Sequence, residues 1–355
     1  MVKRSIHLLI GLLIATIFIW LSLREVDSGD IVSELKSISY WWAIPFALVV
    51  AVGNFIRAER WKMVLDDETG TSNSRVTLFS GLLYGLTSNM VIPRAGEVLR
   101  AVYVAKSTGI ETTRLFGTII SERLIDLFMM LLMLLVTFIL LVTDQRLVNQ
   151  IFGEEGAGYI TALTSTAGLL IIGTGFVVTI GLIWYLRSRR AVNTSSQSDT
   201  AESDSNIIAK PASMMKSFVR GLISIRNLKN WPLFVLYTII IWGGYILMSF
   251  LPFFAFGFPE TFGFGWEQAF VITVIGAVGV MLPSPGGIGT YHYIVQQGLV
   301  VLYAVPSLTA LAYATVNHLA NMITIIVLTL IIYLVNQFRN KNNKSNEIPF
   351  SELIR

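Results

Sequence analysis

The chain has 355 residues, of which 54% are hydrophobic and 14% are charged, and its mean hydropathy is +0.67. A soluble globular domain does not have so apolar a composition, so we predict an all-α polytopic membrane protein. The net charge of +4 does not indicate nucleic-acid binding, because the basic residues lie in short loops beside apolar segments, as the positive-inside rule expects. The absence of cysteine excludes disulfides, thiolate catalysis and cysteine metal sites.

Several apolar runs are long enough to cross a bilayer, which takes roughly 20 helical residues. The first run follows Lys3 and Arg4 and has no small-residue cleavage site, so we interpret it as a retained span and not as a signal peptide. Three shorter runs, 76–92, 267–283 and 288–304, border two stretches rich in proline and glycine. The predicted full spans are 5–23, 41–58, 115–142, 160–186, 231–256 and 306–337.

A polar stretch at residues 187–230 is rich in serine, threonine, asparagine and aspartate. Because it has little to bury, we predict a flexible cytoplasmic linker between the two halves of one transmembrane domain, residues 1–338. The predicted halves are 1–186 and 231–338, and residues 339–355 form a short cytoplasmic tail.

Charge sets the predicted orientation. Most of the 26 lysines and arginines fall on the cytoplasmic side if 76–106 and 267–304 each enter and leave the membrane on one side. Only Arg24, Lys36 and Arg146 then lie outside, so we place both termini in the cytoplasm. The charge pattern is compatible with re-entrant hairpins and equally with pairs of short crossings.

Both halves show the same order of span, hairpin and span. An odd number of spans separates 76–106 from 267–304, so the first hairpin opens to the cytoplasm and the second to the outside. Inverted repeats with interrupted helices at matching positions indicate a transporter-like architecture with a binding site near the midplane of the membrane.

The first interruption is SNMVIPRAGEVLR, residues 88–100. Its proline and glycine should break a helix at a depth where irregular backbone is tolerated only under protein or water. The helix that resumes presents free N–H groups and a positive dipole end, which suit a phosphate. Arg94, Glu97 and Arg100 lie near one face of this helix. The alternative interpretation is a surface loop whose charges line the cytoplasmic rim.

Charged residues also occur near the second and third spans. Arg57, Glu59 and Arg60 end the span 41–58, and we interpret them as rim anchors that reach toward lipid headgroups. In SERLIDLFMM, residues 121–130, Glu122, Arg123 and Asp126 lie within a predicted span, where charges are costly unless they are paired or wetted. They therefore line a cavity or form a structural ion pair with a residue such as Arg100.

The second interruption is GVMLPSPGGIGTYHY, residues 279–293, which contains a proline and glycine turn. His292 follows this turn and His318 lies in the last span beside Asn317, so both are candidates for a polar cavity, with a packing histidine as the alternative. Tyr291 and Tyr293 are predicted interfacial aromatics. The chain has no HExxH spacing, and we expect neither a metal nor a cofactor.

At NMVIPRAGEVLR, SERLIDLF and LPSPGGIGT the sequence resembles the lysylphosphatidylglycerol synthase transmembrane-region family, a flippase-like membrane domain also found as stand-alone bacterial proteins. The resemblance covers most of the chain in matching order. It departs at YHY, where family members often have an acidic residue, which puts in doubt the substrate and any proton coupling through that acid. We expect no aminoacyl-transferase domain and no synthesis of lysyl-lipid.

The resemblance implies a lipid flippase of the bacterial cytoplasmic membrane whose partners are the bilayer and a phosphate-bearing lipid. Arg94 and Arg100 would attract the anion, and Glu122 and Asp126 would balance charge or bind an amine. The alternatives are a non-transporting assembly partner of an envelope enzyme or an intramembrane enzyme. The candidate substrate-binding residues are Asn89, Pro93, Arg94, Gly96, Glu97, Arg100, Glu122, Arg123, Asp126, Pro283, Pro285, Gly286, Gly287, Gly289 and His292.

Overall fold

A computed structural model describes residues 2–24, 26, 28–92, 95–143, 219–220 and 223–343. Every regular element within these ranges is a helix, which confirms the predicted all-helical class. The predicted span 160–186, most of the linker 187–230 and most of the tail lie outside the described residues. The described helices that are long and apolar enough to cross a membrane are Thr112–Thr143, Trp231–Phe254 and Ser307–Arg339.

The chain divides into two compact units. One comprises Met1–Met130 together with Pro211–Arg355, and the other comprises Leu131–Lys210. The description of the second unit covers the end of one helix, Leu131–Thr143. All described candidate site residues belong to the first unit, and the following paragraphs concern that unit.

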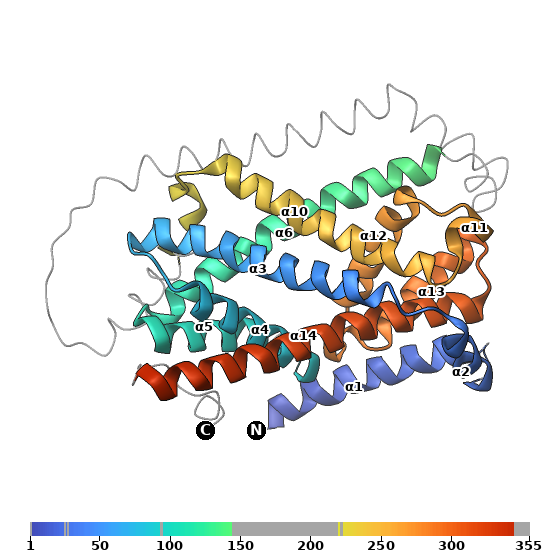
Figure 1. Ribbon diagram of the computed structural model, residues 1–355, viewed down its shortest axis with the longest axis horizontal. Helices are drawn as coiled ribbons and strands as arrows, with labels where there is room; N and C mark the ends of the chain where they lie inside the picture. Colours follow the sequence, from blue (N-terminus) through green and yellow to red (C-terminus); the bar gives the residue numbers. More distant parts are fainter. Residues whose placement is uncertain are drawn as a thin grey trace, which may run out of the picture. The chain divides into compact units, whose positions relative to one another are not determined.

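Long helices and two pairs of shorter helices make up the first unit (Figure 1). The long ones are α1 (Val2–Leu23), α3 (Ala43–Thr69), the first part of α6 (Thr112–Thr143), α10 (Trp231–Phe250) and α14 (Ser307–Asn343). The pairs are α4 (Arg75–Val91) with α5 (Gly96–Thr108), and α12 (Trp266–Met281) with α13 (Thr290–Tyr303). Short connecting helices are α2 (Ser28–Ser37), η1 (Ser224–Asn227), η2 (Leu251–Phe254), α11 (Phe258–Phe262) and η3 (Pro285–Gly287).

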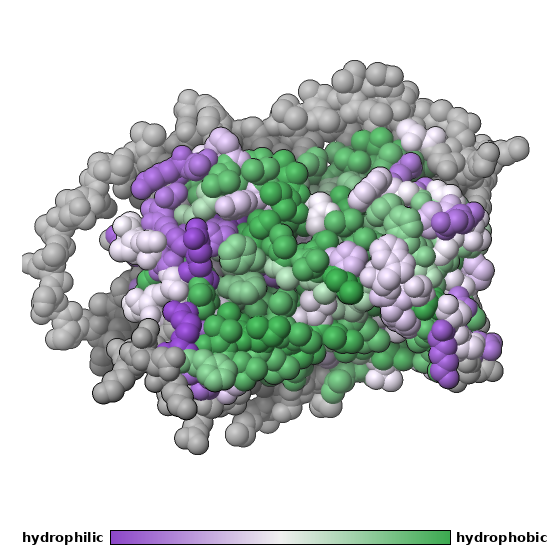
Figure 2. Space-filling model, viewed as in Figure 1, coloured by the Kyte–Doolittle hydropathy of each residue, from purple (hydrophilic) through white to green (hydrophobic). Residues whose placement is uncertain are grey.

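The outer faces of the long helices are apolar. Leu48, Val52 and Phe55 on α3 are exposed, as are Leu330 and Leu334 on α14. Figure 2 shows hydrophobic residues across the middle of this face and hydrophilic residues toward its two ends. An apolar surface of this extent fits contact with lipid and not with water.

The third helix is longer than the sequence predicts. The expected span ends at residue 58, whereas α3 continues to Thr69 and ends at Gly70, which adopts a left-handed conformation with a φ of 70°. The continuation is stabilised by Trp61 and Leu65, which are fully buried in a core shared with α4, α5 and α6. Residues 57–60 therefore lie within the helix and not at its end.

The first helical pair, α4 with α5, depends on a close approach of two glycines. A Cβ atom added to Gly85 would lie 2.8 Å from the carbonyl oxygen of Gly96, and one added to Gly96 would overlap the carbonyl oxygen of Gly85. The amide of Gly96 also donates to Oδ1 of Asn89 at 2.7 Å, which holds the start of α5 against the end of α4. Pro93 and Arg94 lie outside the described residues.

The second pair, α12 with α13, is joined by a turn that requires glycine. Gly286, Gly287 and Gly289 have φ values of 59°, 81° and 82°, which residues other than glycine rarely adopt. Pro285 begins the short helix η3 within this turn, and Pro283 precedes it. The predicted break at 283–289 is therefore confirmed.

The turn of the second pair touches the end of α4. A Cβ atom added to Gly286 would lie 3.2 Å from Cα and 3.7 Å from Cβ of Met90, near the end of α4. In Figure 1 the pair α4 and α5 and the pair α12 and α13 extend toward opposite ends of the picture. The helical pairs are thus present, while their re-entry into a membrane and their relation as an inverted repeat stay predictions.

Candidate functional site

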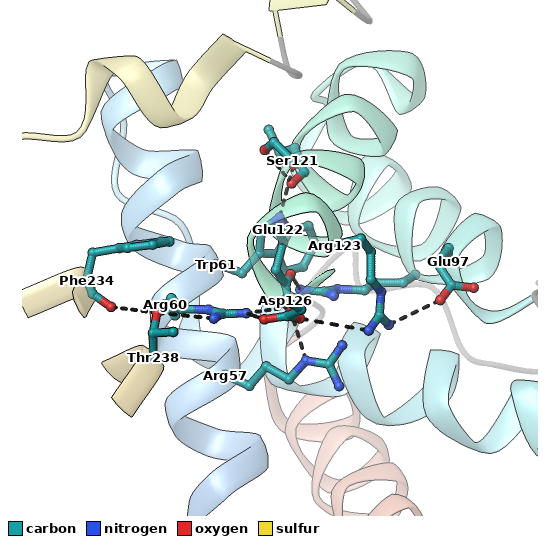
Figure 3. Close-up of polar contacts among 12 residues, drawn as sticks. Arg57, Arg60, Trp61, Glu97, Ser121, Glu122, Arg123, Asp126, Phe234 and Thr238 are labelled. Atoms are coloured by element: carbon teal, nitrogen blue, oxygen red, sulfur yellow. Dashed lines mark hydrogen bonds and ion pairs between the residues drawn. The ribbon is translucent and has the colours of Figure 1, made fainter. Parts of the chain in front are cut away.

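A single buried carboxylate, that of Glu122, is shared by three arginines, two of which are labelled in Figure 3. Arg57 Nε donates to Oε1 of Glu122 at 3.0 Å, and Arg100 Nη2 donates to Oε2 at 2.9 Å. Arg60 Nη2 lies 3.5 Å from Oε1 of the same residue. The Glu122 side chain is 3% exposed, so this ion-pair cluster is buried where α3, α5 and α6 meet.

Asp126 lies one turn further along α6 and pairs mainly with Arg60. The distance from Arg60 Nη2 to Asp126 Oδ1 is 2.7 Å. Arg60 Nη1 also donates to the hydroxyl of Thr238 on α10 at 3.3 Å, and the guanidinium lies 5.7 Å from the ring centre of Phe234. Arg60 is fully buried, and it connects α3 with α6 and α10 (Figure 3).

The prediction that Arg57 and Arg60 are rim anchors is wrong. Both are buried because α3 continues past residue 60, which turns these positions toward α6 and not toward headgroups. Glu59 points elsewhere and pairs with Arg75 at 2.9 Å; the Arg75 side chain is 67% exposed. The missed signal is the spacing of Arg57, Arg60 and Trp61, which is the i, i+3, i+4 pattern of a continuing helix face.

The edge of the cluster is formed by residues of α5 and α6. Arg123 Nη2 donates to Oε1 of Glu97 at 3.1 Å. The Arg100 guanidinium lies 3.8 Å from the ring centre of Trp61, a cation–π contact, and Trp61 itself donates to the hydroxyl of Thr118 at 3.0 Å. Arg100 is therefore fixed by a carboxylate on one side and by an aromatic ring on another.

The cluster has more positive than negative groups and more donors than acceptors. It contains the arginines at 57, 60, 100 and 123 and the carboxylates of Glu97, Glu122 and Asp126, so its formal charge is positive. Buried donors without a partner each cost about 1–3 kcal/mol, so an acceptor-rich anion would stabilise this arrangement. The buried donors that lack a described partner are Arg57 Nη2, Arg60 Nε, Arg100 Nε and Nη1, and Arg123 Nε.

A small open pocket lies beside these donors. Its polar lining consists of Asn89, Glu97, Arg100 and Arg123, and Leu82 and Leu86 of α4 form the apolar side together with Gly85 and Gly96. The free space within it has the size of a water molecule. The structure thus brings the predicted residues 89, 96, 97, 100 and 123 to one pocket, with Glu122 and Asp126 in the ion-pair cluster next to it.

The predicted residues of the second turn form a separate polar group with α14. Asn317 donates to the hydroxyl of Tyr291 at 2.8 Å, and the Tyr291 ring stacks on His318 with centroids 4.7 Å apart. His292 lies 5.1 Å from His318 between ring centroids, and its Nδ1 accepts from the amide of Gly289 at 3.3 Å. Tyr291 thus packs against α14, and its place at the membrane interface stays a prediction.

In the part of the chain that the structure describes, the polar group at the second turn and the pocket on α4 and α5 contact each other only through backbone packing of the second turn. Among the described contacts, no side-chain hydrogen bond joins the two groups. Gly286 lies against Met90, one residue from Asn89 of the pocket. Gly289 lies against the backbone of Ala15 on α1, and Gly287 against His318. The second turn is therefore packed between α1, α4 and α14.

Comparison with known proteins gives one family. The sequence profile of the family described as "Lysylphosphatidylglycerol synthase TM region" matches residues 8–329. No solved structure matches the chain.

Three curated proteins, all archaeal, are similar over most of the chain. A UPF0104 membrane protein of Pyrococcus horikoshii is 22% identical over 89% of this chain and 92% of its own length. A UPF0104 membrane protein of Methanothermobacter thermautotrophicus is 24% identical over 87% of this chain and 86% of its own. Glycosyltransferase AglD of Haloferax volcanii is 23% identical over 92% of this chain, which spans only 54% of that protein.

Proposed function

Since the chain belongs to the lysylphosphatidylglycerol synthase TM region family, we propose that this membrane protein moves a phosphate-bearing lipid headgroup from one side of the membrane to the other. The acyl chains stay in the bilayer while the headgroup passes the polar residues between the helical pairs. In this proposal the chain is a transporter and not an enzyme, because Glu122 and Asp126 are held by arginines and neither is left as a general acid or base.

The observation that carries the proposal is the surplus of arginine donors beside the pocket. Arg100 and Arg123 line it, and each has buried N–H groups without a described partner. Guanidinium groups bind phosphate oxygens through charge-assisted, often bidentate hydrogen bonds, and this match is closer than for an ammonium or a neutral amide. A lipid phosphate provides the acceptors and the negative charge that the cluster lacks.

Movement of the helical pairs provides the pathway. The pocket in this conformation admits no more than a water molecule, so a headgroup enters only after α4 and α5 separate from their neighbours. The contact between Gly286 and Met90 joins the turn of the second pair to the end of α4, and we place the opening there. Alternating access of two halves around a site near the midplane is the mechanism that this arrangement favours.

A second function is favoured by one comparison. The similarity to Glycosyltransferase AglD covers about half of that protein, so the same membrane region occurs within a protein named for glycosyl transfer. On that basis the chain would be a non-transporting partner that anchors or assembles a glycan or lipid enzyme at the membrane. Co-purification of such an enzyme, with unchanged lipid distribution in cells lacking this chain, would favour that role.

Lipid sidedness in proteoliposomes tests the transport proposal. We expect the wild-type protein to equilibrate a phospholipid labelled on its acyl chain between the leaflets, and Arg100→Gln to be strongly impaired. Arg75→Gln is the matched control, because Arg75 is exposed and pairs only with Glu59 at the surface in the contacts described. Absence of translocation by a folded wild-type protein, or equal rates for both variants, would contradict the proposal.

A further inference from the structure

Three of the four oxygens of the two acids predicted to bind a headgroup amine accept hydrogen bonds from arginines. Both oxygens of Glu122 accept from arginines, Oε1 from Arg57 and Oε2 from Arg100. Asp126 Oδ1 accepts from Arg60 at 2.7 Å, and Asp126 Oδ2 lies 4.0 Å from Arg123 Nη1. Asp126 Oδ2 makes no hydrogen bond in the described contacts, but Asp126 does not line the pocket, so a ligand donor in the pocket needs another acceptor.

Glu97 provides that acceptor. Its Oε1 accepts from Arg123, whereas Oε2 is buried and has no hydrogen-bond partner among the described residues. Glu97 also lines the pocket together with Arg100, Arg123 and Asn89. Residues that line one pocket thus carry a buried carboxylate oxygen and several buried guanidinium N–H groups without described partners.

This combination defines the ligand chemistry. Guanidinium donors require an anionic acceptor, and the free oxygen of Glu97 requires a hydrogen-bond donor on the same ligand, a few bonds away. The charge of the cluster limits which headgroups fit. Its described residues include four arginines and three carboxylates, an excess of one positive charge. A phosphodiester with a neutral hydroxyl donor balances this charge, whereas a zwitterionic headgroup with an ammonium does not.

We propose that the pocket selects anionic phospholipids whose headgroup carries a hydroxyl group beside the phosphodiester, as in glycerol or sugar headgroups. Arg100 and Arg123 bind the phosphate, and Glu97 Oε2 accepts a hydrogen bond from the headgroup hydroxyl. Asn89 positions the site, because its Oδ1 holds the amide of Gly96 at the start of the helix that carries Glu97 and Arg100. This inference rests on the proposed lipid transport and names its substrate class.

A water molecule is the competing occupant, since it both donates and accepts and fits the free space in the pocket. In that case Glu97 would contribute to structure through Arg123 and would not distinguish headgroups. Comparison of lipids that differ in a single donor separates these roles.

The experiment measures the rates at which three acyl-labelled lipids cross the bilayer in proteoliposomes. Phosphatidylglycerol has the charge and the hydroxyl donors, phosphatidylethanol has the same charge without a headgroup donor, and phosphatidylethanolamine has an ammonium. We expect the wild-type protein to translocate phosphatidylglycerol roughly tenfold or more faster than either of the others, the size of effect that an unmatched buried polar group produces.

Variants at position 97 complete the test. Glu97→Met keeps the length of the side chain and removes the acceptor, so phosphatidylglycerol and phosphatidylethanol should cross at equal rates, while Glu97→Gln retains an acceptor and part of the preference. If Glu97→Met does not fold, the headgroup preference of the wild-type protein and its reduction in Glu97→Gln still test the inference. Equal wild-type rates, preference for the ammonium lipid or undiminished selectivity in Glu97→Met would overturn this inference, whereas no transport of any lipid would overturn the proposed function itself.

Discussion

Arg100 on α5 and Glu122 on α6 meet at 2.9 Å inside the molecule, with both side chains 3% exposed. A charge inside a membrane-embedded helix bundle is retained only when a partner and hydrogen bonds compensate its burial. Here one carboxylate compensates Arg100 and Arg57 together, and the remaining donors point to a ligand that carries acceptors. The cluster therefore has a structural part, centred on Glu122, and a binding part, centred on the pocket.

Removal of the central carboxylate should destabilise the fold. Glu122→Gln leaves Arg57 and Arg100 buried without their counter-charge, and loss of one partner of a buried pair typically costs about 3–5 kcal/mol. We expect a clear decrease in the thermal unfolding midpoint of the protein in detergent. Glu59→Gln is the control, since its partner Arg75 is exposed and such pairs contribute about 0–1 kcal/mol. A shift for Glu122→Gln as small as the one expected for the control would show that Glu122 has no structural role.

The close packing of α4 on α5 should not tolerate a methyl group. Gly96→Ala places Cβ onto the carbonyl oxygen of Gly85, so the helices must separate at a cost of about 1–3 kcal/mol. Gly53→Ala is the matched change, because nothing lies within 4 Å of the added Cβ and alanine is about 1 kcal/mol more favourable in a helix. Thermal unfolding of both variants should show a loss for the first and none for the second. A stable Gly96→Ala protein would argue against this packing.

Much of the architecture follows from the sequence. The long apolar runs predict α6, α10 and α14, and the proline and glycine residues at 93–96 and 283–289 separate α4 from α5 and α12 from α13, as the structure has them. Charges within an apolar span identify Glu122 and Asp126 as costly unless paired, and each is paired. These predictions succeed because helix breaking and charge burial are decided by local chemistry.

The predicted ion pair of this acidic group with Arg100 is confirmed, whereas the partners on α3 could not be read from the sequence in the same way. The end of an apolar run at residue 58 resembles the end of a helix, so Arg57 and Arg60 were assigned to the rim, although α3 continues and both are buried. Ion pairs between residues more than 60 positions apart depend on how helices pack, which no local pattern encodes. The free oxygen of Glu97 likewise becomes visible only once Arg123 is seen to occupy the other.

Orientation in the membrane is a prediction from charge alone. Single cysteines placed in residues 257–266 should react with a membrane-impermeant thiol reagent added from outside, and cysteines in the 187–230 loop or at the C-terminus should not. No native residue of the chain competes for the thiol reagent, because the chain contains no cysteine. Labelling of the 187–230 loop from outside would reverse the orientation and remove the argument for an inverted repeat.

The central claim, that a headgroup passes where the two helical pairs separate, is tested most directly by a reversible cross-link between their turns. A Cβ atom on Gly286 lies 3.7 Å from Cβ of Met90, within the range of about 3.5–4.5 Å that a disulfide needs. The double variant Met90→Cys with Gly286→Cys is compared with each single variant in proteoliposomes that report lipid sidedness. The Gly286→Cys single variant must itself fold and translocate lipid, because a φ of 59° is one that residues other than glycine rarely adopt. We predict that oxidation stops translocation in the double variant alone and that reduction restores it. Unchanged translocation with the cross-link fully formed would contradict the account.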